Sequence, residues 1–263
     1  MEPLLQTDQP SFSNARDLRL ACRSGRWDRP TAGLAAGYAQ ANLVILPRDW
    51  AFDFLLFCQR NSQACPLLEV TDAGDPVPHL TTPDADLRTD LPGYRIWRDG
   101  ELVAEVGDLH EVWQDDLVSF LIGCSFTFEA ELLRSGLPVR HQEFGCNVPM
   151  FRTNVPCRPA GRFFGPLVVS MRPYSPAQAI HAVQVTANFP GSHGPPIHWG
   201  DPTIIGIEDI HQPDYGDPVP LYPGEVPVFW ACGVTPQAVL QNAKPPLAIT
   251  HQPGKMFLTD LRE

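Results

Sequence analysis

The stretch EVPVFWACGVTPQAVL, residues 225–240, decides how the rest of the sequence is interpreted. Its apolar run Val226–Ala231 predicts a buried strand. The run ends at Cys232-Gly233, and Thr235 then has the position of a helix N-cap followed by proline. The stretch therefore predicts a strand that leads directly into a helix N-terminus. Free backbone N–H groups at such a terminus suit an anion, and the same residues also serve to turn a corner.

The composition is that of a globular protein that does not bind nucleic acid. Hydrophobic residues make up 43% of the 263 residues and aromatic residues 10%, which is enough for a sizeable core. The net charge of −11 argues against a nucleic-acid partner, because phosphate binding requires a basic face.

The cysteines and the N-terminus indicate a cytoplasmic protein. The seven cysteines are scattered without CxxC pairs, as reduced buried thiols are. The opening MEPLLQTDQP has neither the basic nor the apolar region of a signal peptide. No run of about 18 apolar residues occurs, so we also expect no membrane partner.

Strand and helix signals alternate at both ends of the chain. YRIWRDGELVAEV (94–106) predicts a hairpin with Asp99-Gly100 as its two-residue turn. DLHEVWQDDLVSFLIG (108–123) and FTFEAELLRSG (126–136) have apolar residues at helical spacing.

The pattern changes after Pro138. Three strands are predicted there, PVRHQEF (138–144), VPMFRTN (148–154) and GPLVVSMRP (165–173), followed by a helix that Ser175-Pro176 begins. We therefore predict an α/β main domain formed by residues 1–136 and 193–263, with residues 137–192 as an inserted α+β domain.

Three junctions combine glycine, a polar or thiol side chain and a helix N-terminus: Gly123-Cys124-Ser125, Gly200-Asp201-Pro202 and Cys232-Gly233. Because ligands in open α/β sheets collect at the carboxyl ends of strands, we expect one shared pocket. Cys124 and Cys232 are each candidates for a nucleophile activated by a helix dipole, the alternative being a small buried thiol.

Two side chains are candidates for acid–base chemistry. Glu129 stands among phenylalanines, which predicts a raised pKa, although a glutamate in a first helical turn also complements the helix dipole. His251, at the end of a predicted strand, is a candidate general base.

Arginines are the candidates for binding a carboxylate. RTNVPCRPAGRFFGPLVVSMRP (152–173) places Arg152, Asn154 and Arg158 among apolar neighbours. An arginine in such surroundings is expected to have a carboxylate partner, in the protein or in a ligand.

The sequence predicts neither a metal nor a nucleotide cofactor. His193, His198 and Asp201 have the spacing H-x4-H-x2-D, but two prolines between the histidines break any helix that would align them. We therefore assign His193 and Asp201 to substrate binding. No GxGxxG, P-loop or GxSxG motif occurs.

Several long strings resemble the bacterial hydro-lyases of the D-glutamate cyclase family: GLAAGYAQANLVILP, GCSFTFEAEL, RTNVPCRPAGRFFGPLVVSMRP, PGEVPVFWACGVTPQ and ITHQPGKMFLTD. The resemblance extends over about residues 15–261. It implies a three-layer αβα domain that carries a smaller two-layer α/β domain. The implied activity is dehydration of free D-glutamate to 5-oxo-D-proline.

This reaction is consistent with a defined set of residues, which we assign on chemical grounds. Lactam formation needs a proton acceptor, a proton donor, donors for the oxyanion and an anchor for the α-carboxylate. The catalytic candidates are Glu129, His251 and Cys232. The substrate-binding candidates are Arg152, Asn154, Arg158, Cys124, Ser125, His193, Asp201, Gly233 and Thr235.

Two other functions stay open at this point. A non-catalytic binding module for an acidic metabolite would need the arginines and helix N-termini without a paired acid and base. A metal-assisted hydratase of a hydroxy acid would use His193, His198 and Asp201 as ligands. The expected partner is a small carboxylate in every case, and formation of a homo-oligomer is left open.

Overall fold

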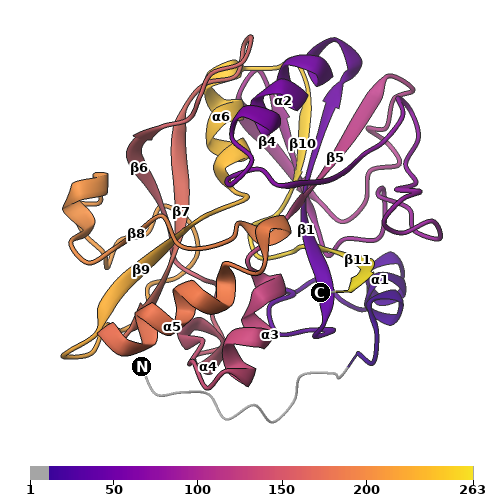
Figure 1. Ribbon diagram of the computed structural model, residues 1–263. Helices are drawn as coiled ribbons and strands as arrows, with labels where there is room; N and C mark the ends of the chain where they lie inside the picture. Colours follow the sequence, from indigo (N-terminus) through magenta and orange to yellow (C-terminus); the bar gives the residue numbers. More distant parts are fainter. Residues whose placement is uncertain (1–11, 263) are drawn as a thin grey trace.

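The computed structural model describes residues 12–262 and contains two antiparallel sheets (Figure 1). Residues 1–11, to which the expectation of no signal peptide applies, lie outside the described residues. The first sheet has seven strands in the order β2-β5-β1-β10-β3-β4, with β11 paired to β1. The second sheet has the order β6-β7-β9-β8.

The first sheet consists of β1 (Tyr38–Pro47), β2 (Leu67–Val70), β3 (Tyr94–Arg98), β4 (Glu101–Val106), β5 (Leu117–Gly123), β10 (Ala248–His251) and β11 (Phe257–Arg262). The second consists of β6 (Met150–Pro156), β7 (Pro166–Tyr174), β8 (His198–Trp199) and β9 (Val226–Ala231). The helices are α1 (Ala15–Arg23), α2 (Arg48–Arg60), α3 (Phe126–Arg134), α4 (Arg140–Glu143), α5 (Pro176–Thr186) and α6 (Thr235–Ala243), with 3-10 turns η1 (Pro190–Ser192) and η2 (Pro202–Ile205).

Local sequence signals explain several element ends. Asn14 caps α1 by accepting a hydrogen bond from the Asp17 N–H, and Ser175 forms a capping box at the start of α5. The β3–β4 hairpin turns at Asp99 and Gly100, whose φ angles of 50° and 84° fit a two-residue turn. The predictions of this hairpin and of the strand Val226–Ala231 are confirmed.

Helix α6 lies between the two sheets. Val239 and Leu240 share a core with Val44 of β1 and Trp97 of β3, and α6 also contacts β7. Helix α2 packs on the same face of the first sheet through Phe54. Loops rather than helices cover the opposite face, through residues that include Leu87, Leu91 and Leu109. The fold is therefore mixed α/β, and the three-layer αβα arrangement is not confirmed.

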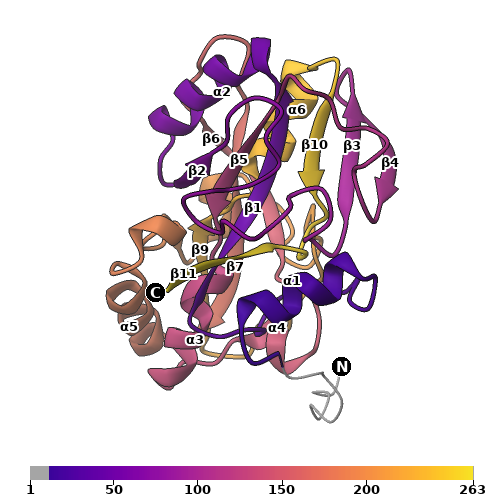
Figure 2. The same ribbon diagram turned by 90° about the vertical axis from the view of Figure 1, so that its right-hand side faces the viewer.

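The second sheet packs against helices at one end of the molecule, where α3, α4 and α5 gather (Figure 2). Phe128 of α3 and Ala182 of α5 meet Trp230 of β9 in one buried cluster. On the other face, Phe229 packs with Ile205 of η2. The sheet thus has a helical side and a loop side.

The predicted helix over residues 108–123 is wrong, because residues 108–116 form turns and loop and the rest form a strand. Residues Leu117–Gly123 form β5, every residue of which is buried between β1 and β2. A continuous apolar run such as LVSFLIG fits a strand that is buried on both faces as well as a helix. The predicted strand at residues 138–144 is also wrong, since Arg140–Glu143 form the short helix α4.

The second sheet contains a strand from outside residues 137–192, which the sequence predicted to form an inserted domain. Strand β9 begins at Val226, yet it belongs to the same sheet as β6 and β7. The division into residues 1–136 with 193–263 and residues 137–192 stays a prediction. Among residues 12–262, no helix has both the length and the apolar character needed to cross a bilayer.

Candidate functional site

Two helix N-termini meet where the sheets adjoin, as the opening stretch predicts for one of them. Cys124 precedes α3 at the end of β5, and Cys232 precedes α6 at the end of β9; both lie in one buried apolar cluster. The backbone N–H groups of Phe126 and Val234 lie near the Cys124 and Cys232 sulfur atoms, respectively, and partly offset the rise of each thiol pKa that burial causes.

The environment of these thiols disfavours a nucleophilic role. Burial raises the pKa of the Cys232 thiol to about 11 and also raises the pKa of Cys124. Both groups are thus protonated at neutral pH, whereas a nucleophile needs the thiolate. The seven cysteines are all free, as the sequence predicts.

Gly233 and Thr235 have structural roles at this junction. A Cβ atom on Gly233 would overlap the side-chain amide of Asn42. The N-cap of α6 is Val234, not Thr235, so the predicted cap is wrong. The Thr235 hydroxyl donates instead to the Cys232 carbonyl at 2.7 Å and accepts from the Val168 N–H at 3.1 Å. It links β7, β9 and α6.

A buried charge cluster lies beside the two N-termini. Glu129 of α3 forms an ion pair with Arg172 of β7, and its Oε1 atom is 3.1 Å from His141 Nε2. All three side chains are at most 1% exposed. Gln142 donates to Glu129 Oε2 at 2.6 Å, and Arg172 donates to the Ser125 hydroxyl at 3.1 Å. The cluster holds α3, α4 and β7 together.

The ion pairs determine the protonation state of Glu129. Burial alone would raise its pKa, but the charges of His141 and Arg172 and their hydrogen bonds lower it to about 2. The raised pKa expected from the neighbouring phenylalanines is therefore wrong. An ionised carboxylate with three internal partners is poorly suited to donate a proton to a substrate.

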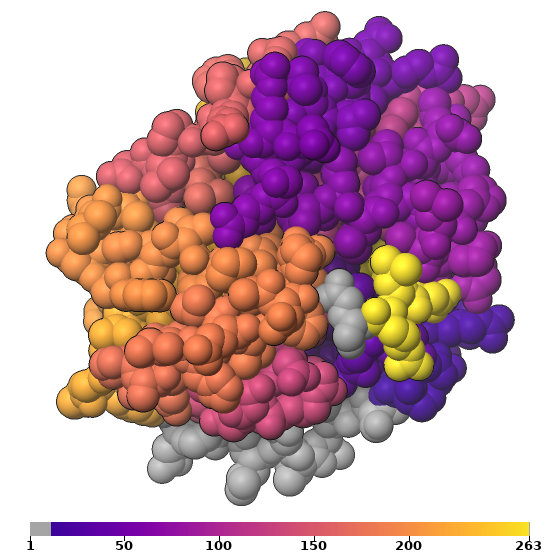
Figure 3. All heavy atoms as spheres, in the orientation of Figure 1, coloured from indigo at the N-terminus to yellow at the C-terminus, as the bar shows by residue number. Residues whose placement is uncertain are grey.

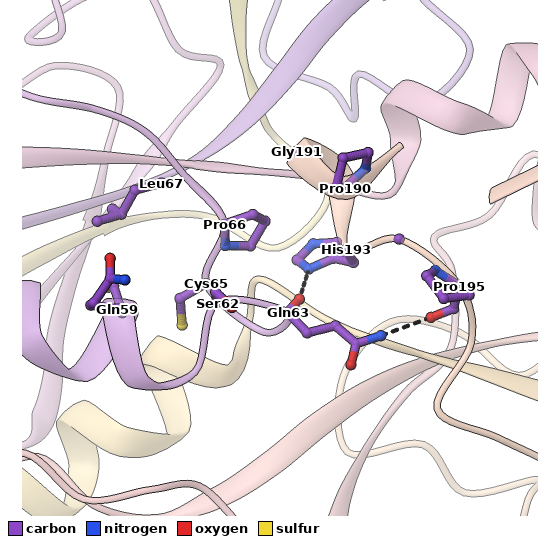
Figure 4. Close-up of a pocket in the computed structure, with 12 residues that line it drawn as sticks. Gln59, Ser62, Gln63, Cys65, Pro66, Leu67, Pro190, Gly191, His193 and Pro195 are labelled. Carbon is purple, nitrogen blue, oxygen red and sulfur yellow. Dashed lines mark hydrogen bonds between the residues drawn. The ribbon is translucent and has the colours of Figure 1, made fainter. Parts of the chain in front are cut away.

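His193 is the side chain best placed for proton transfer. It is 1% exposed and has φ of 78°, in the left-handed region. Its Nδ1 atom lies 2.8 Å from the Gln63 carbonyl oxygen (Figure 4). Because a carbonyl can only accept, Nδ1 carries the proton. Nε2 of the neutral ring keeps its lone pair but is itself buried, with the Gly123 backbone close to the ring. Burial lowers the pKa of His193 to about 4, so the ring is neutral at pH 7.

His193 lines a cavity of about 470 Å³. The walls come from residues 58–67 and 190–195, which adjoin in the space-filling view (Figure 3). A second cavity, of about 350 Å³, shares Ser62 and Gln63 with the first and is also lined by Arg60 and Arg158. Each cavity alone has a volume in the range of small-molecule sites.

The other predicted binding residues are divided between surface and interior. Arg158 is exposed, and its guanidinium makes no hydrogen bond or ion pair with residues 12–262. Arg152 is also exposed, and it donates to the Tyr215 hydroxyl at 2.8 Å and to Gln241. Asn154 is bonded weakly to the Ile204 carbonyl, at 3.4 Å.

The three junctions do not share the two cavities described above. Asp201 is exposed and caps η2 by accepting from the Thr203 N–H at 3.0 Å. His198 Nε2 is bonded to the Asp201 carbonyl, while His193 is bonded to Gln63. Cys124 and Cys232 are brought together, but neither lines either cavity.

His251 lies within the first sheet. Its Nδ1 atom is 3.1 Å from the Leu43 N–H nitrogen, and burial lowers its pKa to about 4. Thr250 pairs with Val44, so alternation places His251 on the other face, with the core that contains Leu43. The sheet therefore separates His251 from the core that holds α6. Its assignment as a base stays a prediction.

Gly123, at the end of β5, packs directly against the backbone of residues 190–193, and a substitution can test this contact. A Cβ atom at position 123 would overlap the Gly191 carbonyl oxygen. We expect Gly123→Ala to lower the free energy of unfolding by about 3 kcal/mol, since backbone must move to relieve the overlap. Gly107→Ala is the control, because a Cβ atom there meets nothing within 4 Å. Equal urea midpoints for the two variants would contradict the close contact.

The fold is mixed α/β, with a cavity of small-molecule size near a buried charge cluster. Comparison with known proteins gives the family: the model of the D-glutamate cyclase family matches residues 118–260. The chain belongs to this family. The matched part includes Glu129, Arg172 and His193.

Relatives in several bacteria have names that contain the word hydro-lyase. The protein of Bacillus licheniformis is 60% identical over 247 residues, which is 94% of each chain. That of Stutzerimonas stutzeri is 61% identical over 94% of this chain and 93% of its own. That of Bacillus subtilis is 58% identical over 94% of this chain and 96% of its own.

A solved structure was also compared, the nitrogen repressor-like protein of Methanococcus jannaschii. The match covers 92% of this chain and 97% of that chain at 9% identity. Its TM-score of 0.38 is too low to bear on the fold.

The sequence did not indicate the residues that bind the side chains of Glu129 and His193. Arg172 stood out only as one arginine among several, although its neighbours in VVSMRP are apolar. His141 was placed in a predicted strand, and Gln63 carried no signal at all. Each acts through a residue distant in sequence, Glu129 or His193.

Proposed function

We propose that the protein is a hydro-lyase of a small carboxylic or amino acid, and that its reaction is the cyclisation of D-glutamate to 5-oxo-D-proline. The observation that carries the proposal is His193, a buried neutral imidazole in the wall of a cavity of small-molecule size, whose Nε2 atom has no hydrogen-bond partner among the described residues. The choice of reaction follows the description of the family to which the chain belongs, D-glutamate cyclase.

Charge near the cavity supports an acidic substrate. Arg60 and Arg158 line the adjoining cavity, on a protein with a net charge of −11. Arg158 has no partner for its guanidinium among the described residues, so it is available to a ligand carboxylate. A guanidinium binds a carboxylate through two parallel hydrogen bonds. The α-carboxylate is thus held at Arg158 and the reacting groups extend toward His193.

The chemistry needs one proton acceptor that can also return the proton. The amine nitrogen of D-glutamate attacks the side-chain carboxyl carbon, and an N–C bond forms. The ammonium nitrogen gives up two protons in the course of the reaction, and His193 takes each at Nε2 and passes it to the departing carboxylate oxygen. The C–O bond then breaks and the oxygen leaves as water, which balances D-glutamate against 5-oxo-D-proline plus water. In this mechanism Glu129 and Cys232 support the fold around the site instead of reacting.

Turnover of D-glutamate, followed by NMR, tests the proposal and separates an enzyme from a binding module. We expect Arg158→Lys to raise KM about tenfold, because lysine keeps the charge but loses the two-pronged geometry, and charge-assisted bonds contribute about 1.5–3 kcal/mol each. Arg134→Lys is the control, since Arg134 pairs with Glu131 on the surface of α3. An unchanged KM in Arg158→Lys would exclude Arg158 as the anchor, and absence of turnover would exclude the reaction.

A further inference from the structure

The cavity beside His193 has an uncharged wall. Twelve residues line it, and none of them is Asp, Glu, Lys or Arg. Its polar side chains are amides and a hydroxyl, from Gln59, Ser62 and Gln63, and the pKa of His193 is about 4, so this ring is also neutral at pH 7 (Figure 4). The described part of the chain therefore offers hydrogen bonds here without a compensating charge.

Charged side chains near this cavity do not give it a net charge. Arg172 lies near enough to influence the pKa of His193, but Glu129 neutralises it through a buried ion pair. The arginines that have a free charge, Arg158 among them, line the adjoining cavity instead. The neutral cavity thus adjoins, at Ser62 and Gln63, a cavity that is lined by arginines.

A dicarboxylate fits such a site poorly. Its first carboxylate is held by arginine, but the second enters a region where only neutral groups replace its water shell. Transfer of an ionised carboxylate without a charged partner is far more costly than transfer of an amide, which needs only hydrogen bonds.

We propose that the site prefers acids with a single carboxylate and an uncharged amide at the other end over dicarboxylates. The inference rests on the proposed function, within which it means that 5-oxo-D-proline binds more tightly than D-glutamate. D-Glutamine is the matched probe, because it differs from D-glutamate only in its uncharged side-chain end.

A charge added to the neutral wall should reverse the preference. Gln59 is exposed on α2 and lines the cavity (Figure 4), so Gln59→Lys places an ammonium there with little effect on the core. Gln114→Lys makes the same change of net charge at an exposed position that does not line the cavity, in the loop before β5. The pair separates a local charge from a change in overall charge.

Isothermal titration at pH 7 with the three ligands tests the proposal. We expect the parent protein to bind D-glutamine and 5-oxo-D-proline at least tenfold more tightly than D-glutamate. Gln59→Lys should tighten D-glutamate about tenfold and leave D-glutamine within twofold, whereas Gln114→Lys should change neither. Equal or tighter binding of D-glutamate by the parent overturns this inference alone. Failure of all three ligands to bind overturns the proposed function with it.

Discussion

Replacing Glu129 with glutamine should lower the free energy of unfolding by about 3–5 kcal/mol, because the change leaves two buried groups without their counter-charge. Arg172 is 1% exposed and would keep only neutral hydrogen-bond partners, among them the hydroxyls of Ser125 and Ser170. His141, also 1% exposed, would lose its carboxylate partner. Urea unfolding measures the loss, which is a large part of the stability of a typical domain.

Glu131→Gln is the matched control on the same helix. Glu131 pairs with Arg134 at the surface, where their side chains are 36% and 60% exposed. Exposed pairs of this kind contribute about 0–1 kcal/mol, so the control should unfold close to the parent. Similar losses in the two variants would show that the buried cluster is not a determinant of stability.

The same carboxylate predicts how stability depends on pH. The folded-state pKa of Glu129, about 2, is lower than the value of 4.5 for the free side chain. Its contribution is therefore fully present above pH 4.5 and is lost as the pH falls toward 2. We expect Glu129→Gln to remove this part of the acid dependence.

His193→Asn should lower kcat/KM for D-glutamate by about 10²–10⁴-fold, the usual contribution of a general base. Asparagine is a close substitute in every other respect. Its side-chain amide can donate to the Gln63 carbonyl as Nδ1 does, and asparagine tolerates the left-handed backbone that His193 adopts at φ of 78°. The variant lacks the Nε2 lone pair and part of the ring volume but keeps the Gln63 contact and the backbone geometry, so the fold should be retained.

Two further measurements check this role. His181→Gln, at an exposed position on α5, should leave kcat/KM unchanged. Because the base must be neutral and the pKa of His193 is lowered to about 4, the acid limb of kcat/KM should lie near pH 4 and not near 6.5. Activity of His193→Asn within tenfold of the parent would assign the base elsewhere, with His251 as the next candidate.

Local signals in the sequence were sufficient to predict several elements and their ends. The apolar run Val226–Ala231 is β9, Asp99-Gly100 is a hairpin turn, and Ser175 caps α5, because each depends on residues within a few positions. The run over residues 117–123 was assigned to a helix, since a strand buried on both faces shows no alternation.

The site was predicted only in part, because its groups are joined by contacts between distant residues. Glu129, Ser125 and His193 were selected for their chemistry, and all three lie in or beside the site described here. Their roles depend on partners far along the chain: Glu129 pairs with Arg172 and His193 with Gln63. Without those partners, a glutamate among phenylalanines predicts a raised pKa, whereas the arginine lowers it.

The position of β10 has a consequence for the order in which the chain folds. This strand comes from residues Ala248–His251, almost at the C-terminus, yet it lies between β1 and β3 in the first sheet. Until it is synthesised, β2, β5 and β1 cannot join the β3–β4 hairpin through backbone hydrogen bonds. Such pairing between distant segments slows folding. On the ribosome, the first sheet therefore stays in two parts until the last strands emerge, while β6, β7 and β9 can already pair.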